Sequence, residues 1–67
     1  MISKYKHKKR GTIYNLLHSQ VINTDKGADR NILYSIYSNG TRVFMMNIDE
    51  FNNKFEKISY FKGELNE

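Results

Sequence analysis

The sequence predicts a small all-β domain with one short helical turn. Stretches rich in β-branched and aromatic residues recur along the 67 residues, apolar and polar residues alternate within them, and turn-forming residues separate them. A chain this short has room for one core, and it buries only about 60% of the surface exposed when it is unfolded. We therefore expect one marginally stable domain at residues 1–62, a frayed tail at residues 63–67, and assembly into a homo-oligomer that buries more surface.

Two strands are predicted in the first third of the chain, at residues 1–10 and 12–22. In the first, lysines alternate with aromatic residues, so one side carries Lys4, Lys6 and Lys8 and the other Tyr5, His7 and Lys9. In the second, His18, Ser19 and Gln20 interrupt the apolar pattern, which predicts a β-bulge. Apolar residues occur on both sides of the second strand, so the sequence leaves its buried face open.

A central β-hairpin is predicted at residues 31–46, closed by Asn39 and Gly40. A type I′ turn needs positive φ at both central positions, which Asn tolerates and Gly adopts freely. This turn would pair Ile36 with Val43. We expect one face to be the core, and it carries Ile32, Tyr34, Ile36, Val43 and Met45. The other face is mixed, and it carries Leu33, Ser35, Tyr37, Arg42, Phe44 and Met46.

The remaining elements follow from shorter signals. Residues 23–30 are polar and predict a loop. Asn47 is a predicted N-cap for a single helical turn over residues 47–53, with acidic residues in its first turn. A longer helix through Lys57 is the alternative, because the apolar residues here also have helical spacing. Residues 55–61 alternate in polarity and predict a closing strand, and Phe51 and Phe55 are expected in the core.

This order of elements resembles a small SH3-like β-barrel of about five strands, in which a helical turn precedes the last strand. The residues also resemble a family of small bacterial and phage (prophage) proteins known only as a domain of unknown function. The likeness covers roughly residues 4–58 and is carried by the runs 5–14, 32–34 and 50–56 and by Phe44. Met46 and Asn47 stand where that family usually has Arg-Pro. The resemblance implies the SH3-like fold and a phage-like origin, and it supplies no mechanism.

The basic residues gather in one segment. The formal net charge is +4, the first ten residues carry +5, and the remainder has six basic and seven acidic residues. Basic side chains interleaved with Tyr and His suit the phosphates of a nucleic acid or nucleotide. We therefore expect an anionic ligand at Lys4, Lys6, Lys8, Lys9 and Arg10. The alternative is that lysines on a strand edge only prevent edge-to-edge pairing.

The mixed face of the hairpin is a second candidate site. Aromatic residues beside an arginine are typical of protein-interface anchors and of base-stacking surfaces. If Tyr37, Arg42, Phe44 and Met46 are exposed, this face would let the chain inhibit or regulate a host protein. The alternative is that the barrel curls over these side chains and makes them a second half of the core.

Catalytic and metal-binding residues are scarce in this sequence. There are two histidines and no cysteine, and a zinc site needs about three protein ligands. The glycines are isolated, so no phosphate-binding loop is present. We expect no enzyme activity, no cofactor and no metal. The absence of cysteine and of an apolar run near 20 residues favours the cytoplasm of a bacterial host, without membrane association.

Overall fold

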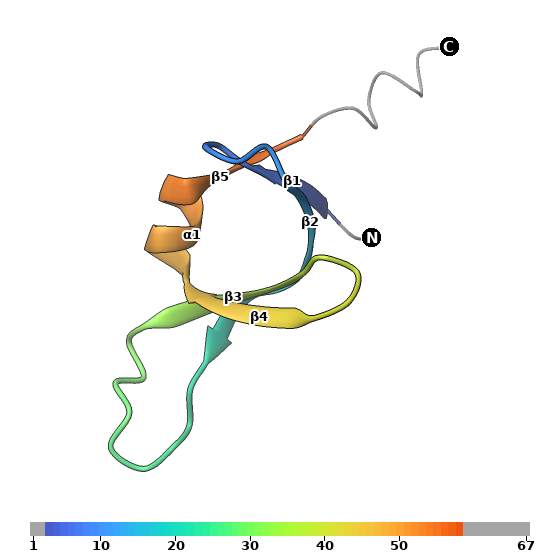
Figure 1. The fold of residues 1–67 in the computed structure, drawn as a ribbon. Helices are drawn as coiled ribbons and strands as arrows, with labels where there is room; N and C mark the ends of the chain where they lie inside the picture. The colour runs from blue at the N-terminus through green and yellow to red at the C-terminus, as the bar shows by residue number, and fades with distance from the viewer. Residues whose placement is uncertain (1–2, 59–67) are drawn as a thin grey trace.

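The computed structural model describes residues 3–58, in which five strands and one helix form a small all-β fold, as predicted. The elements are β1 (Ser3–His7), β2 (Ile13–Ile22), β3 (Leu33–Ser38), β4 (Val43–Asn47), α1 (Ile48–Lys54) and β5 (Phe55–Lys57). They build one antiparallel sheet in the order β4-β3-β2-β1-β5, so the last strand returns to the first. Figure 1 shows the sheet curled into a ring that α1 completes between β4 and β5. A short helix before the last strand confirms the predicted order of elements.

Some of the sequence predictions fall outside the described residues. The closing strand is seen as β5, and its predicted continuation through Phe61 lies beyond residue 58. The domain boundary at residue 62, the frayed tail at residues 63–67 and the first two residues of the predicted β1 also lie outside. Within the described part of the chain, no helix has the length and apolar character needed to cross a membrane.

Strand β2 is bent by the predicted bulge. Its pairing with β3 shifts register between Leu16 and His18 and again between His18 and Val21, and Gln20 has a φ of 59°. A bulge places extra residues opposite the partner strand and increases the local twist. Residues 13–16 of β2 pair with β1, and residues 15–22 of β2 pair with β3. The bend at the bulge lets one strand pair with both neighbours.

The β3–β4 connection differs from the predicted two-residue turn. Ser38 pairs with Val43 and Ile36 with Met45, so the connecting loop has four residues, Asn39–Arg42. Gly40 has a φ of 97°, but Asn39 is not at positive φ, so the type I′ prediction is wrong. The Asn39 side chain explains the wider loop, because its Oδ1 accepts hydrogen bonds from the backbone N–H groups of Thr41 (2.9 Å) and Arg42 (2.8 Å).

The buried face of the hairpin is the opposite of the predicted one. The observed pairing differs from the predicted one by two residues, so the same side chains share each face as predicted. The face predicted to be the core is exposed, however, since Val43 and Met45 are 64% and 56% exposed. Tyr34 and Ile36, also predicted in the core, are only half-buried. The core consists of Tyr37, Phe51 and Phe55, and the residues packed against it are Tyr5, Tyr14, Leu16, Phe44 and Met46.

The aromatic residues explain this choice of face. Phe51 and Phe55, at 1% and 3% exposure, confirm the prediction that they are core residues. Their rings lie 5.1 and 5.2 Å from the ring of Tyr37, between centroids. The hairpin face that carries Tyr37 must therefore turn toward α1 and β5. Its opposite face, which was expected to be the core, becomes the convex outer surface.

Helix α1 begins at the predicted N-cap. The Asn47 side chain accepts hydrogen bonds from the N–H groups of Asp49 (2.8 Å) and Glu50 (3.3 Å). The helix has seven residues, and Phe55 follows in an extended conformation. The alternative of a longer helix through Lys57 is therefore wrong.

Candidate anion-binding site at the β1–β2 turn

His7 organises the turn that follows β1. Its ring Nδ1 accepts hydrogen bonds from the backbone N–H groups of Lys9 (3.3 Å) and Arg10 (3.1 Å). Its backbone closes the turn, since His7 N donates to Thr12 O (2.9 Å) and Gly11 N donates to His7 O (2.8 Å). The imidazole also packs edge-on against Phe55, with centroids 5.1 Å apart. His7 is thus a structural histidine of this turn.

The turn is fastened to the end of α1. The backbone N–H of Lys8 donates to the carbonyl of Lys54, 2.9 Å away. This bond joins two segments that are far apart in the sequence and brings their lysines together. Between them lies a hollow of about 510 Å³, lined by His7, Lys8, Lys9, Asn53 and Lys54.

The hollow is electropositive. Lys8 and Lys9 are exposed, and within residues 3–58 neither makes an ion pair. Lys54 lies 3.0 Å from Glu50, measured from Nζ to Oε2, so one carboxylate balances one of the three lysines. The environment lowers the pKa of His7, first through its partial burial and then through the positive charges of Arg10, Lys54 and Lys9. At neutral pH the imidazole is therefore uncharged, and Nδ1 can accept its two hydrogen bonds.

The five predicted ligand-binding residues do not form one cluster. Lys8 and Lys9 line the hollow, and Arg10 follows them in the same turn. Lys4 and Lys6 are on β1, opposite Tyr5 and His7, as the alternation predicts. Lys4 Nζ donates to Asn15 Oδ1 (2.8 Å), and Lys6 Nζ lies 3.5 Å from Glu56 Oε2. These two lysines are therefore bound to neighbouring strands, away from the hollow.

The second predicted site is not an exposed surface. Tyr37 is 7% exposed and belongs to the core, and half-buried Phe44 and Met46 pack against it, so these three residues do not form the exposed face on which the prediction depends. Arg42, the fourth residue, is exposed in the β3–β4 loop. The barrel curls over the aromatic face because Phe51 and Phe55 supply its other half.

Sequence reasoning missed Asn53 and Lys54. The i,i+4 pair of Glu50 and Lys54 was a readable signal for a helix that ends at this lysine. Nothing in the linear sequence indicates that this helix end lies beside Lys8. That proximity depends on the pairing of β5 with β1, where His7 stands opposite Phe55.

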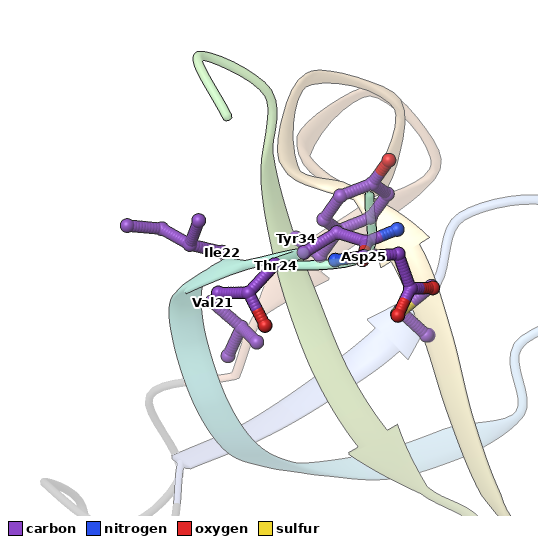
Figure 2. A pocket seen from close by; sticks show the side chains of 7 residues that line it. Val21, Ile22, Thr24, Asp25 and Tyr34 are labelled. Atoms are coloured by element: carbon purple, nitrogen blue, oxygen red, sulfur yellow. The ribbon is translucent and has the colours of Figure 1, made fainter. Parts of the chain in front are cut away.

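A second hollow, of about 340 Å³, lies where the β2–β3 loop leaves the barrel (Figure 2). It is lined by Val21, Ile22, Asn23, Thr24, Asp25, Tyr34 and Met45. Its charged residue is an aspartate, so it is unsuited to an anion. Among residues 3–58, no three His, Asp or Glu side chains come together in a way that could hold a metal ion.

Comparison with known proteins identifies no relative. No protein-family model, no curated protein and no solved structure matches the chain. The resemblance to the bacterial and phage family remains a prediction, and the candidate site stands on its geometry.

Proposed function

We propose that this protein is a non-enzymatic module that binds the phosphates of a nucleic acid or nucleotide at the hollow of the β1–β2 turn. The observation that carries the proposal is the convergence of Lys8, Lys9 and Lys54 around a space of about 510 Å³. A hollow of this size falls in the range of small-ligand sites. No carboxylate lines it, and Glu50 offsets only Lys54.

The side chains, and not the backbone, would hold the anion. The N–H groups of Lys9 and Arg10 already donate to His7, and that of Lys8 donates to Lys54. The lysine ammonium groups are point charges with several donors, and the Asn53 amide adds a neutral donor. His7 would act as a positioning residue, because it holds the turn that presents Lys8 and Lys9.

Base stacking would contribute little to this binding. The aromatic residues of the first strand, Tyr5 and His7, are half-buried, and their rings pack against phenylalanines of the core. Tyr5 packs edge-on against Phe51 at 5.1 Å between centroids, and His7 packs against Phe55. Recognition would therefore rest on charge, which makes binding insensitive to base identity and strongly dependent on salt.

Binding of a labelled single-stranded oligonucleotide tests the proposal, measured by fluorescence anisotropy between about 50 and 200 mM salt. Lys9→Glu should weaken binding and reduce the slope of log K against log salt by about 1 or more. Lys26→Glu is the matched control, because Lys26 is exposed in the β2–β3 loop, which Figure 1 shows on the opposite side of the barrel. A parallel titration with a nucleoside monophosphate separates nucleotide from polymer binding. Equal losses in the two variants would contradict a localised site.

A further inference from the structure

The sheet has two edges, and they differ in chemistry. One edge strand is β5, which has three residues, includes Glu56 and Lys57, and is tied to β1 by the Lys6–Glu56 pair. The other is β4, Val-Phe-Met-Met-Asn, which carries no charge and no proline. Natural proteins usually protect a strand edge with charges, proline or a bulge. Edge β4 has none of these.

The hydrogen-bond phase of the hairpin shows which backbone groups β4 presents at its edge. The N–H of Asn39 donates to the carbonyl of Arg42 (3.2 Å), so these two loop residues occupy the position of a hydrogen-bonded pair, although they make only one of its two backbone bonds. Such pairs alternate along an antiparallel ladder. In the observed register, Phe44 and Met46 therefore bond to β3, whereas Val43, Met45 and Asn47 direct their backbone groups to the free edge. Within residues 3–58, the inter-element backbone bonds include none from these three residues.

The same residues expose apolar side chains. Val43 and Met45 project from the outer face of the sheet, beside half-buried Ile36 and Tyr34 on β3. The second hollow reaches this surface, since Met45 and Tyr34 line it (Figure 2). An unpaired backbone edge beside exposed apolar side chains suits another uncharged strand.

We propose that β4 pairs antiparallel with β4 of a second copy of this chain, around a two-fold axis at Met45. This register pairs Met45 with its own copy and Val43 with the partner's Asn47. The two Met45 residues exchange N–H and carbonyl bonds, and each Asn47 N–H donates to the partner's Val43 carbonyl. The two five-strand sheets then form one continuous sheet, and the exposed Met45 side chains cover each other.

Charge complementarity selects this register. With the axis at Met45, Arg42 falls opposite the partner's Ile48, one residue from the partner's Asp49. Within residues 3–58, neither Arg42 nor Asp49 takes part in an ion pair of its own chain. An axis at Val43 would instead bring the two Arg42 residues near each other and shorten the overlap. An axis at Asn47 would place α1 in the ladder, and a helix cannot pair there.

Cysteine cross-linking tests both the contact and the register, because the chain has no cysteine of its own. Met45→Cys should give a disulfide-linked dimer on mild oxidation, since opposed residues in a hydrogen-bonded pair have Cα atoms about 5.5 Å apart. Val43→Cys should not, because the two copies of Val43 would be separated by the length of four strand residues. Efficient cross-linking of Val43→Cys with none of Met45→Cys would overturn the register.

The mass in solution provides the second test, measured by sedimentation equilibrium over a range of protein concentrations. Val43→Lys with Met45→Lys should give a folded monomer, whereas the unchanged chain gives a dimer. Ile13→Lys with Leu17→Lys is the matched control, because these residues are also exposed, at 45% and 37%, but lie on β2 away from the second hollow. A chain that stays monomeric at all concentrations, or a dimer that survives the β4 lysines, would overturn the proposal. Circular dichroism confirms folding of each variant.

Discussion

Phe51 and Phe55 stack face to face, with ring centroids 4.5 Å apart and 14° between the ring planes. Phe51 is on α1 and Phe55 begins β5, so this contact spans the junction where the helix ends and the chain returns to the sheet. Tyr37 of β3 lies against both rings. The stack therefore links the last two elements to the centre of the barrel.

Phe51→Ala should abolish most of the stability of the domain. Truncating a buried phenylalanine costs about 3–5 kcal/mol, and the total stability of a domain this small is of that order. We expect the variant to be largely unfolded at 25 °C by circular dichroism. Lys26→Ala is the control, and as an exposed loop position it should change the unfolding free energy by no more than about 0.5 kcal/mol. A cooperative thermal transition of Phe51→Ala near that of the unchanged chain would contradict this account of the core.

Gly40→Val tests the revised β3–β4 loop. A Cβ at Gly40 would meet no atom within 4 Å, so the cost comes from the backbone alone. At a φ of +97°, a β-branched residue should destabilise the domain by on the order of 1–2 kcal/mol. Thr41→Val in the same loop is at negative φ and should have little effect. Urea midpoints measure the stability of the two variants. Equal midpoints would show that the loop does not require a residue at positive φ at position 40.

His7 should make stability depend on pH. The pKa of His7 lies below its usual value of 6.5 because of partial burial and the nearby charges of Arg10, Lys54 and Lys9. The unfolded chain therefore takes up a proton at a pH where the folded chain does not. Neutral His7 therefore contributes to the free energy of unfolding above pH 6.5. This contribution decreases as the pH falls below 6.5, until His7 is protonated in the folded chain as well.

Urea unfolding at about pH 7.5 and about pH 5.5 measures this loss, in a window above the ordinary carboxylate range. His7→Gln removes the titrating group and should make the two midpoints more nearly equal. A urea midpoint that rises as the pH falls, in the unchanged chain, would contradict the predicted direction of the pH dependence.

Bound phosphate should raise the pKa of His7, so the anion-site proposal also predicts a shift in the NMR titration of His7.

The element order was readable because its signals are local. Asn47 caps α1 through its own side chain, and the interrupted pattern at His18–Gln20 becomes the bulge of β2. The prediction of which hairpin residues share a face is also confirmed, because side-chain alternation follows from backbone geometry. Alternation also predicts that Tyr5 and His7 share one face of β1. The packing of Tyr5 on Phe51 makes this the inner face.

Only the tertiary structure decided which face of the hairpin is buried, because both faces carry enough apolar residues to serve as a core. Phe51 and Phe55 lie on elements that arrive later in the chain, and their packing on Tyr37 turns that face inward and leaves Val43 and Met45 outside. The candidate anion-binding site also depends on the tertiary structure, because it forms where β5 pairs with β1. The sequence supplied Lys8 and Lys9, but Lys54 joins them only through the pairing of β5 with β1, a long-range contact that no local pattern encodes.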